Sequence, residues 1–78
     1  MRYQTKGTCS TAIDIELANG VIESVTFERG CNGNLQGISA LVKGMTPEEA
    51  IRRLKGIRCG MKSTSCPDQL AQALESML

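Results

Sequence analysis

The chain has 78 residues, with nine basic and eight acidic side chains, a formal net charge of +1 and no histidine. This length fits one domain, which we expect to span residues 1–78. The balanced charge argues against a general nucleic-acid or anionic-membrane binder, and the lack of histidine excludes Ser-His-Asp and Cys-His catalysis.

The first third of the sequence predicts an antiparallel sheet, either a hairpin or three strands. The predicted strands cover about residues 2–6, 8–18 and 21–29. Apolar and polar residues alternate along the middle strand, which predicts one apolar face. Asn19-Gly20 is a hairpin signal between the second and third strands. In the last strand, Val21, Val25 and Phe27 are predicted to share the apolar face.

The apolar residues also predict the register of the hairpin. We expect Ile13 opposite Phe27 and Ile15 opposite Val25, because a shift by one residue would set these isoleucines against polar residues. The pairing implies a three-residue loop.

The remainder of the sequence predicts three helices, over about residues 32–44, 47–55 and 66–77. The second follows a Thr46 cap and begins at Pro47, and the third follows a Ser65 cap with Pro67 and Asp68 in its first turn. The predicted buried positions of the first and third helices are Leu35, Ile38, Leu41, Val42, Met45, Leu70, Ala71, Leu74, Met77 and Leu78. The element order predicts a small α+β domain with the three helices on one face of the sheet.

Four cysteines fall at strand ends, in loops or at helix starts, where ligands and reactive groups usually lie. They are Cys9, Cys31, Cys59 and Cys66. The expected register brings Cys9 beside Cys31, and Cys66 begins a helix, whose free N–H groups stabilise a thiolate. Four thiolates suit zinc in a closed tetrahedral site, or an iron–sulfur cluster. Redox-active pairs and unliganded structural thiols are the alternatives.

The location of the protein bears on these alternatives. No stretch approaches the about 18 apolar residues of a transmembrane helix, and residues 1–10 lack the apolar run of a signal peptide. We therefore expect a cytoplasmic protein with no membrane partner. Cytosolic thiols are usually kept reduced, which favours metal or redox chemistry over structural disulfides.

A glycine-rich strand-to-helix segment and a basic run form a candidate anion- or nucleotide-binding site. Its residues are Gly30, Asn32, Gly33, Arg58 and Lys62. Backbone N–H groups at a helix start can bind phosphate, but the segment lacks the Lys-Ser/Thr of a P-loop. The alternative is that the glycines free the backbone or let helix and sheet pack closely. Asp68 is either a metal ligand or proton acceptor, or a helix-start carboxylate.

At Thr64-Ser65-Cys66-Pro67-Asp68 the chain resembles the TSCPD domain family, which is named for that string. The resemblance covers nearly the whole chain. Its other matches are Cys9, Gly30-Cys31-Asn32-Gly33-Asn34, Gly44-Met45-Thr46 and Cys59-Gly60. It implies a small four-cysteine module that is similar to a region near the C-terminus of adenosylcobalamin-dependent ribonucleotide reductases.

This resemblance implies an alternative function, as a redox or nucleotide-sensing accessory to ribonucleoside-diphosphate reductase in deoxyribonucleotide synthesis. The partner would then be a reductase or a thioredoxin-like protein. A chain of 78 residues is too short to hold a reductase barrel, so we do not expect a complete enzyme.

A weaker similarity is to iron–sulfur cluster assembly scaffolds, in which Cys9, Cys31 and Cys66 would take the places of the scaffold cysteines. Ser10 stands where such scaffolds have an aspartate, and Ser65 stands where they have a histidine. With a fourth cysteine in addition, these departures favour a closed metal site over labile cluster transfer.

Overall fold

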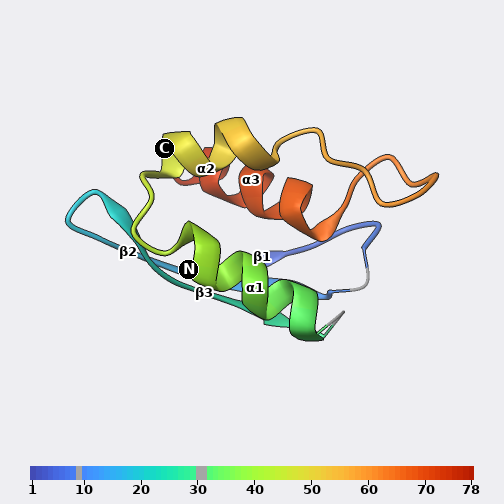
Figure 1. Ribbon diagram of the computed structural model, residues 1–78, viewed down its shortest axis with the longest axis horizontal. Helices are drawn as coiled ribbons and strands as arrows, with labels where there is room; N and C mark the ends of the chain where they lie inside the picture. Colours follow the sequence, from blue (N-terminus) through green and yellow to red (C-terminus); the bar gives the residue numbers. More distant parts are fainter. Residues whose placement is uncertain (9, 30–31) are drawn as a thin grey trace.

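The computed structural model describes residues 1–8, 10–29 and 32–78 as three strands followed by three helices (Figure 1). These elements are β1 (Arg2–Gln4), β2 (Ala12–Ala18), β3 (Val21–Glu28), α1 (Asn32–Val42), α2 (Pro47–Leu54) and α3 (Cys66–Ser76). The strands form one antiparallel sheet in the order β1-β2-β3, which confirms the predicted α+β fold. No helix in the described ranges is long and apolar enough to cross a membrane.

The predicted register of the hairpin is confirmed along most of its length. Ile13 pairs with Phe27 and Ile15 pairs with Val25. Both isoleucines are fully buried, so the apolar face that predicted the pairing is the face against which the helices pack.

The predicted three-residue loop is wrong, because a β-bulge changes the register near the turn. Beside the turn Leu17 pairs with Ile22, one residue out of step with the rest of the hairpin. The connection is therefore a two-residue turn, in which Asn19 and Gly20 have φ of 55° and 80°, as an Asn-Gly type I′ turn requires. The bulge also turns Ile22 into the core in place of Val21, which is only half-buried.

The middle strand begins later than predicted, at Ala12 rather than near residue 8. The hydroxyls of Thr5 and Thr8 donate to the carbonyl of Ser10, which competes with strand pairing in this segment. In this segment Ser10 is buried and Thr11 is exposed. The predicted pairing of Cys9 with Cys31 lies outside the described residues.

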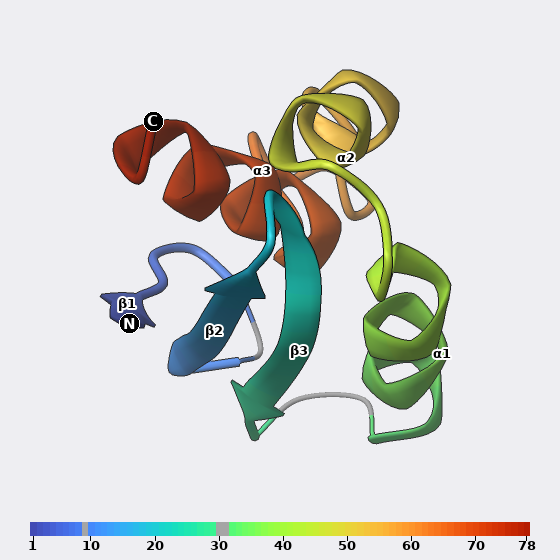
Figure 2. The same ribbon diagram turned by 90° about the vertical axis from the view of Figure 1, so that its left-hand side faces the viewer.

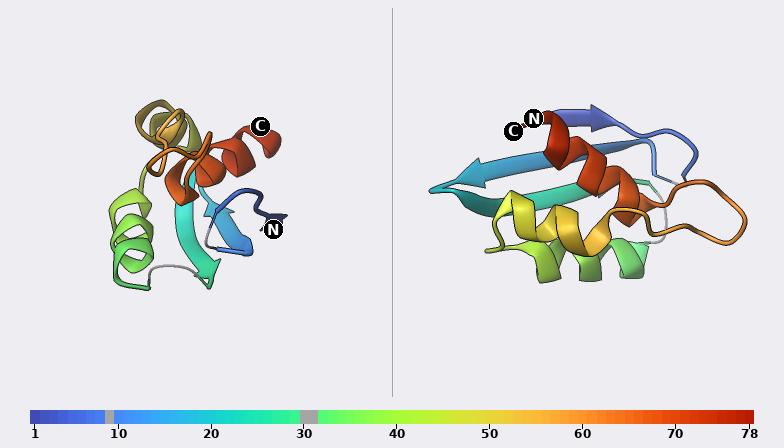
Figure 3. Two further views of the ribbon diagram at one scale, coloured as in Figure 1. Left: turned by 90° about the vertical axis from the view of Figure 1, so that its right-hand side faces the viewer. Right: turned by 90° about the horizontal axis from the view of Figure 1, so that it is seen from above.

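The helices pack on the sheet at different depths. In Figures 1 and 2, α3 lies over the sheet and α2 lies on α3, farther from the strands. Seen from above, α3 runs obliquely across the strands, and α1 lies along β3 (Figure 3). The largest fully buried side chains, which come from β2, β3 and α3, are Ile13, Ile15, Ile22, Leu70 and Leu74.

Two predicted core positions are wrong, since Leu41 is 74% exposed and Leu78 is 67% exposed. Leu41 lies beside the buried Val42, at the edge of the apolar face of α1. Leu78 follows the last turn of α3. Helical spacing identifies the apolar face, but its width depends on what packs against it.

The connection between α1 and α2 is joined to the sheet. The first helix ends at Val42, two residues before Gly44, whose φ is +90°. The Gly44 N–H donates to the Ile22 carbonyl, and the Ile22 N–H donates to the Met45 carbonyl, both at 2.8 Å. This pair of hydrogen bonds holds the chain against the outer edge of β3.

Candidate cysteine site

The start of α3 confirms its predicted cap and presents Cys66 as the first helical residue. The Ser65 hydroxyl accepts from the Asp68 N–H at 3.1 Å and donates to the Ile57 carbonyl at 2.6 Å. Pro67 follows in the first turn, where its missing N–H leaves no bond unmade. The half-buried Cys66 side chain therefore lies at the positive end of a helix of 11 residues.

A buried serine contacts the Cys66 thiol. Ser10 is 3% exposed, and its Oγ lies 3.2 Å from Cys66 Sγ, within hydrogen-bonding distance for sulfur. Thr8 Oγ1 lies 3.3 Å from the same Ser10 Oγ. This contact spans 56 residues of sequence and was not predicted. In the sequence, this position stands out only because Ser10, next to Cys9, replaces the aspartate of the iron–sulfur scaffolds.

Cys59 lies in the loop between α2 and α3. Its N–H donates to the Thr64 carbonyl at 3.2 Å, and its carbonyl accepts from the Lys62 N–H at 3.0 Å. Cys59 and Cys66 are both free thiols, and both line a pocket of about 310 Å³. The other residues of this pocket are Asn34, Leu35, Ile38, Ser65 and Pro67. The fold thus brings Cys59 and Cys66 to one place, beside the first turns of α1.

The carboxylate of Asp68 is buried, with 6% exposure, and is fully hydrogen-bonded. It accepts from the Thr64 hydroxyl at 2.5 Å, the Gly56 N–H at 2.8 Å and the Gln72 side chain at 2.9 Å. The Thr64 hydroxyl and then the Gly56 N–H hold the pKa of Asp68 below its ordinary value. Both oxygens are engaged in these bonds, which agrees with a helix-start carboxylate rather than a metal ligand.

Gln69 is a second buried polar residue of α3, and no sequence pattern indicates its role. Its amide donates to Thr64 Oγ1 at 3.0 Å, and its oxygen accepts from the Lys6 N–H at 3.1 Å. The segment that leads to Ser10 is thereby joined to the start of α3. Thr64, Ser65 and Asp68 of the five-residue string therefore organise the backbone around Cys66.

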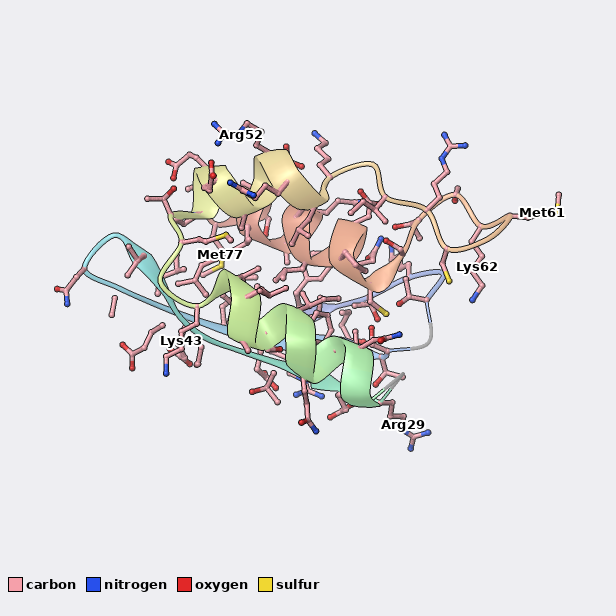
Figure 4. All side chains as sticks on the ribbon, in the orientation of Figure 1. Arg29, Lys43, Arg52, Met61, Lys62 and Met77 are labelled. Atoms are coloured by element: carbon pink, nitrogen blue, oxygen red, sulfur yellow. The ribbon has the colours of Figure 1, made fainter. Side chains whose placement is uncertain are left out.

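The candidate anion-binding residues are spread over two regions. Arg58 and Lys62 are exposed in the α2–α3 loop and form no ion pair with the described side chains. Figure 4 shows Lys62 near the far end of this loop. Asn32 begins α1, Gly33 is its second residue, and Gly30 lies outside the described residues. A Cβ added at Gly33 would meet nothing within 4 Å, so close packing does not explain this glycine.

Three further basic residues close to this loop form ion pairs on the helices. Arg53 pairs with Glu49 at 2.9 Å, and Arg52 pairs with the same Glu49. Lys55 pairs with Glu75 of α3 at 2.8 Å. These contacts account for the three residues as surface pairs of α2 and its C-terminus.

Two of the four predicted metal-ligating residues lie in described parts of the chain. Over residues 1–8, 10–29 and 32–78, no three Cys, Asp or Glu side chains are grouped closely enough to hold a metal ion. Cys9 and Cys31 lie outside these ranges. The described residues thus supply Cys59 and Cys66 in one pocket, with Ser10 against Cys66.

Comparison with known proteins agrees with the five-residue string at the start of α3. Residues 1–78 match the TSCPD domain. Searches of curated proteins and of solved structures found no match. Since the match covers the whole chain, the protein belongs to the TSCPD domain family.

Proposed function

We propose that this protein is a non-catalytic metal-binding module in which four thiolates hold one zinc ion. The ligands would be Cys9, Cys31, Cys59 and Cys66. With no histidine in the chain, thiolates are the softest ligands that it offers, and four of them suit a closed tetrahedral zinc site.

The observation that carries the proposal is the pocket that Cys59 and Cys66 share. Ser10, the chain neighbour of Cys9, has its hydroxyl 3.2 Å from Cys66 Sγ. Asn34, three residues after Cys31, lines the same pocket. Described residues close in sequence to each of the four cysteines therefore meet at one end of the molecule, which supports a single site.

The surroundings of Cys66 also suit a thiolate ligand. The helix N-terminus favours negative charge, and the Ser10 hydroxyl can donate to the sulfur. Bound zinc would join the loop, the helix start and the strand ends of a domain whose core is small. Zinc has no redox chemistry, so this function is structural or regulatory.

The test is metal analysis of protein purified anaerobically without added metal. We expect about one zinc per chain, and loss of zinc together with loss of folded structure when a strong chelator is added. Iron with acid-labile sulfide would instead identify an iron–sulfur cluster. Metal-free protein that stays folded in the presence of chelator would refute the proposal.

Serine substitutions at the cysteines test the ligand set. Each single Cys→Ser variant should bind zinc more weakly, because serine replaces a thiolate with a poor zinc ligand. Ser63→Ala is the matched control, since Ser63 is exposed in the same loop as Cys59. If a Cys→Ser variant binds zinc as tightly as this control, the substituted cysteine is not a ligand.

A second candidate function is dithiol exchange, which is favoured because Cys59 and Cys66 are free thiols that line one pocket. The two thiols would form a disulfide, passing two electrons and two protons to the disulfide of a thioredoxin-like partner. Titration of the chain against glutathione redox buffers should then reveal a two-electron couple near cytosolic poise. No Cys59–Cys66 disulfide in any such buffer would exclude this function.

A further inference from the structure

The loop between α2 and α3 is closed at its base by the side chains of Ser65, which donates to the Ile57 carbonyl, and of Asp68. The Asp68 carboxylate accepts from the Gly56 N–H at 2.8 Å, where the loop begins, and from the Thr64 hydroxyl at 2.5 Å, where it ends. Figures 1 and 4 show this loop extending from the body of the molecule, with Met61 and Lys62 at its far end. A surface loop with neighbouring ends is an Ω-type loop, and here the two ends share one acceptor.

Asp68 is well suited to hold this closure. Its side chain is buried, and the three hydrogen bonds that it accepts from described residues come from uncharged donors. The nearby cation Lys55 pairs with Glu75 instead. A buried carboxylate that lost these donors would be left with a large desolvation penalty. The Asp68 carboxylate therefore fixes the positions of its donors at the two loop ends, the Gly56 N–H and the Thr64 hydroxyl.

The closure connects the two thiols of the pocket. The Cys59 N–H donates to the carbonyl of Thr64, and the hydroxyl of the same Thr64 donates to Asp68. Asp68 lies in the first turn of α3, which begins at Cys66. Two hydrogen bonds thus lead from the backbone of Cys59 to the helix turn that presents Cys66.

We propose that Asp68 is a positioning residue, which holds the loop that carries Cys59 against the start of α3 so that Cys59 and Cys66 form one preorganised half of the metal site. The inference rests on the proposed function for its consequence, and on the hydrogen bonds above for its geometry. Asp68 acts through Thr64 and Gly56, and does not itself contact the metal.

Substitutions can separate this role from general stability. Asp68→Asn keeps the shape but replaces one carboxylate oxygen with an NH2 group, which cannot accept from the donor or donors on its side. Thr64→Val removes the hydroxyl and keeps the shape, whereas Thr64→Ser keeps the hydroxyl and should rescue. Glu75→Gln is the matched control, because it alters an exposed ion pair of the same helix.

Zinc affinity, measured by competition with a chromophoric chelator, is the first readout. We expect Asp68→Asn and Thr64→Val to weaken zinc binding about 10- to 100-fold, the usual effect of losing a partner behind the ligands. Thr64→Ser and Glu75→Gln should stay near the wild-type affinity. Wild-type affinity in Asp68→Asn would overturn the proposal.

A double-mutant cycle shows whether the effect passes through Cys59. If Asp68 positions Cys59, the Cys59→Ser substitution should weaken zinc binding less in Asp68→Asn than in the wild type. The same cycle with Cys31→Ser should show additive losses. Equal coupling to both cysteines would indicate a merely structural role and would overturn the proposal.

The hydrogen bonds of Asp68 to Thr64 and Gly56 form a tether between the loop and α3. Amide hydrogen exchange of the folded chain as purified, with whatever metal it holds, separates failure of this tether from failure of the proposed function. Exchange at the Cys59 N–H should be faster in Asp68→Asn and in Thr64→Val than in the wild type, and close to the wild-type rate in Thr64→Ser. That pattern supports the tether even if the wild type binds no zinc. A wild type that binds no zinc would refute the proposed function but not the tether. Unchanged exchange at Cys59 would overturn the tether whether or not zinc binds.

Discussion

The contact between Ser10 and Cys66 predicts the effect of removing one hydroxyl. If Cys66 is a thiolate ligand, it has no proton to donate, so Ser10 Oγ must be the donor across the 3.2 Å separation. Ser10→Ala deletes that donor, and with it the 3.3 Å contact between Ser10 Oγ and Thr8 Oγ1. Thr8 Oγ1 keeps its hydrogen bond to the backbone carbonyl of residue 10, at 3.1 Å.

The expected magnitude follows from the burial of this contact. Ser10 is 3% exposed, so water does not readily replace its hydroxyl. A hydrogen bond of this kind contributes about 1 kcal/mol net, which corresponds to about fivefold in the zinc dissociation constant. We therefore expect Ser10→Ala to bind zinc about two- to tenfold more weakly than the wild type.

Competition with a chromophoric chelator at fixed pH measures this difference directly. Thr11→Ala is the matched control, because Thr11 is the exposed neighbour and its hydroxyl bonds to Glu28 rather than to a cysteine. If Ser10→Ala and Thr11→Ala bind zinc equally well while Cys66→Ser binds poorly, the proposed role of the hydroxyl is refuted.

Three further predictions concern the fold. Leu74→Ala should destabilise the protein by about 2–5 kcal/mol in urea unfolding, since Leu74 is fully buried. Leu41→Ala, at a leucine that is 74% exposed, should change stability by less than about 0.5 kcal/mol, and equal losses would contradict the core assignment. Gly37→Ala should stabilise by about 0.4–1 kcal/mol, because this helical glycine has room for a Cβ; a destabilised variant would show that the space is filled. Hydrogen bonding to Arg2 lowers the pKa of Glu28, so their pairing stabilises the fold above the ordinary glutamate pKa and is lost as the pH falls through the lowered value. NMR titration of the carboxyl carbon should show the pKa of Glu28 rising in Arg2→Gln; an unchanged pKa would rule out the pairing.

Features set by a few neighbouring residues could be predicted from the sequence. The start of α3 at Cys66 follows from Ser65, Pro67 and Asp68, which specify a helix start within one turn. The main register of the hairpin follows from its apolar face. The three-residue loop is wrong because that register does not continue to the turn. A bulge shifts the pairing by one residue and leaves a two-residue Asn19-Gly20 turn.

Features set by distant packing could not be predicted. The contact of Ser10 with Cys66 joins segments 56 residues apart, and no periodicity specifies it. Leu41 carries the same helical spacing as buried residues, but α1 lies along β3 and leaves this side chain exposed. For Asp68 the sequence allowed two interpretations, and the hydrogen bonds from Thr64 and Gly56 distinguish them.

The hydrogen bonds between Ile22 and the α1–α2 connection also bear on aggregation. β3 is an edge strand, and an edge strand with free N–H and C=O groups is a template for strands of other chains. At Ile22 both groups are already bonded, to Met45 and Gly44, so a foreign strand cannot extend its pairing past this point. A folding intermediate in which α1 and α2 have not yet docked lacks this protection. At Ile22, therefore, edge-to-edge pairing is open only while the α1–α2 connection is not docked on β3.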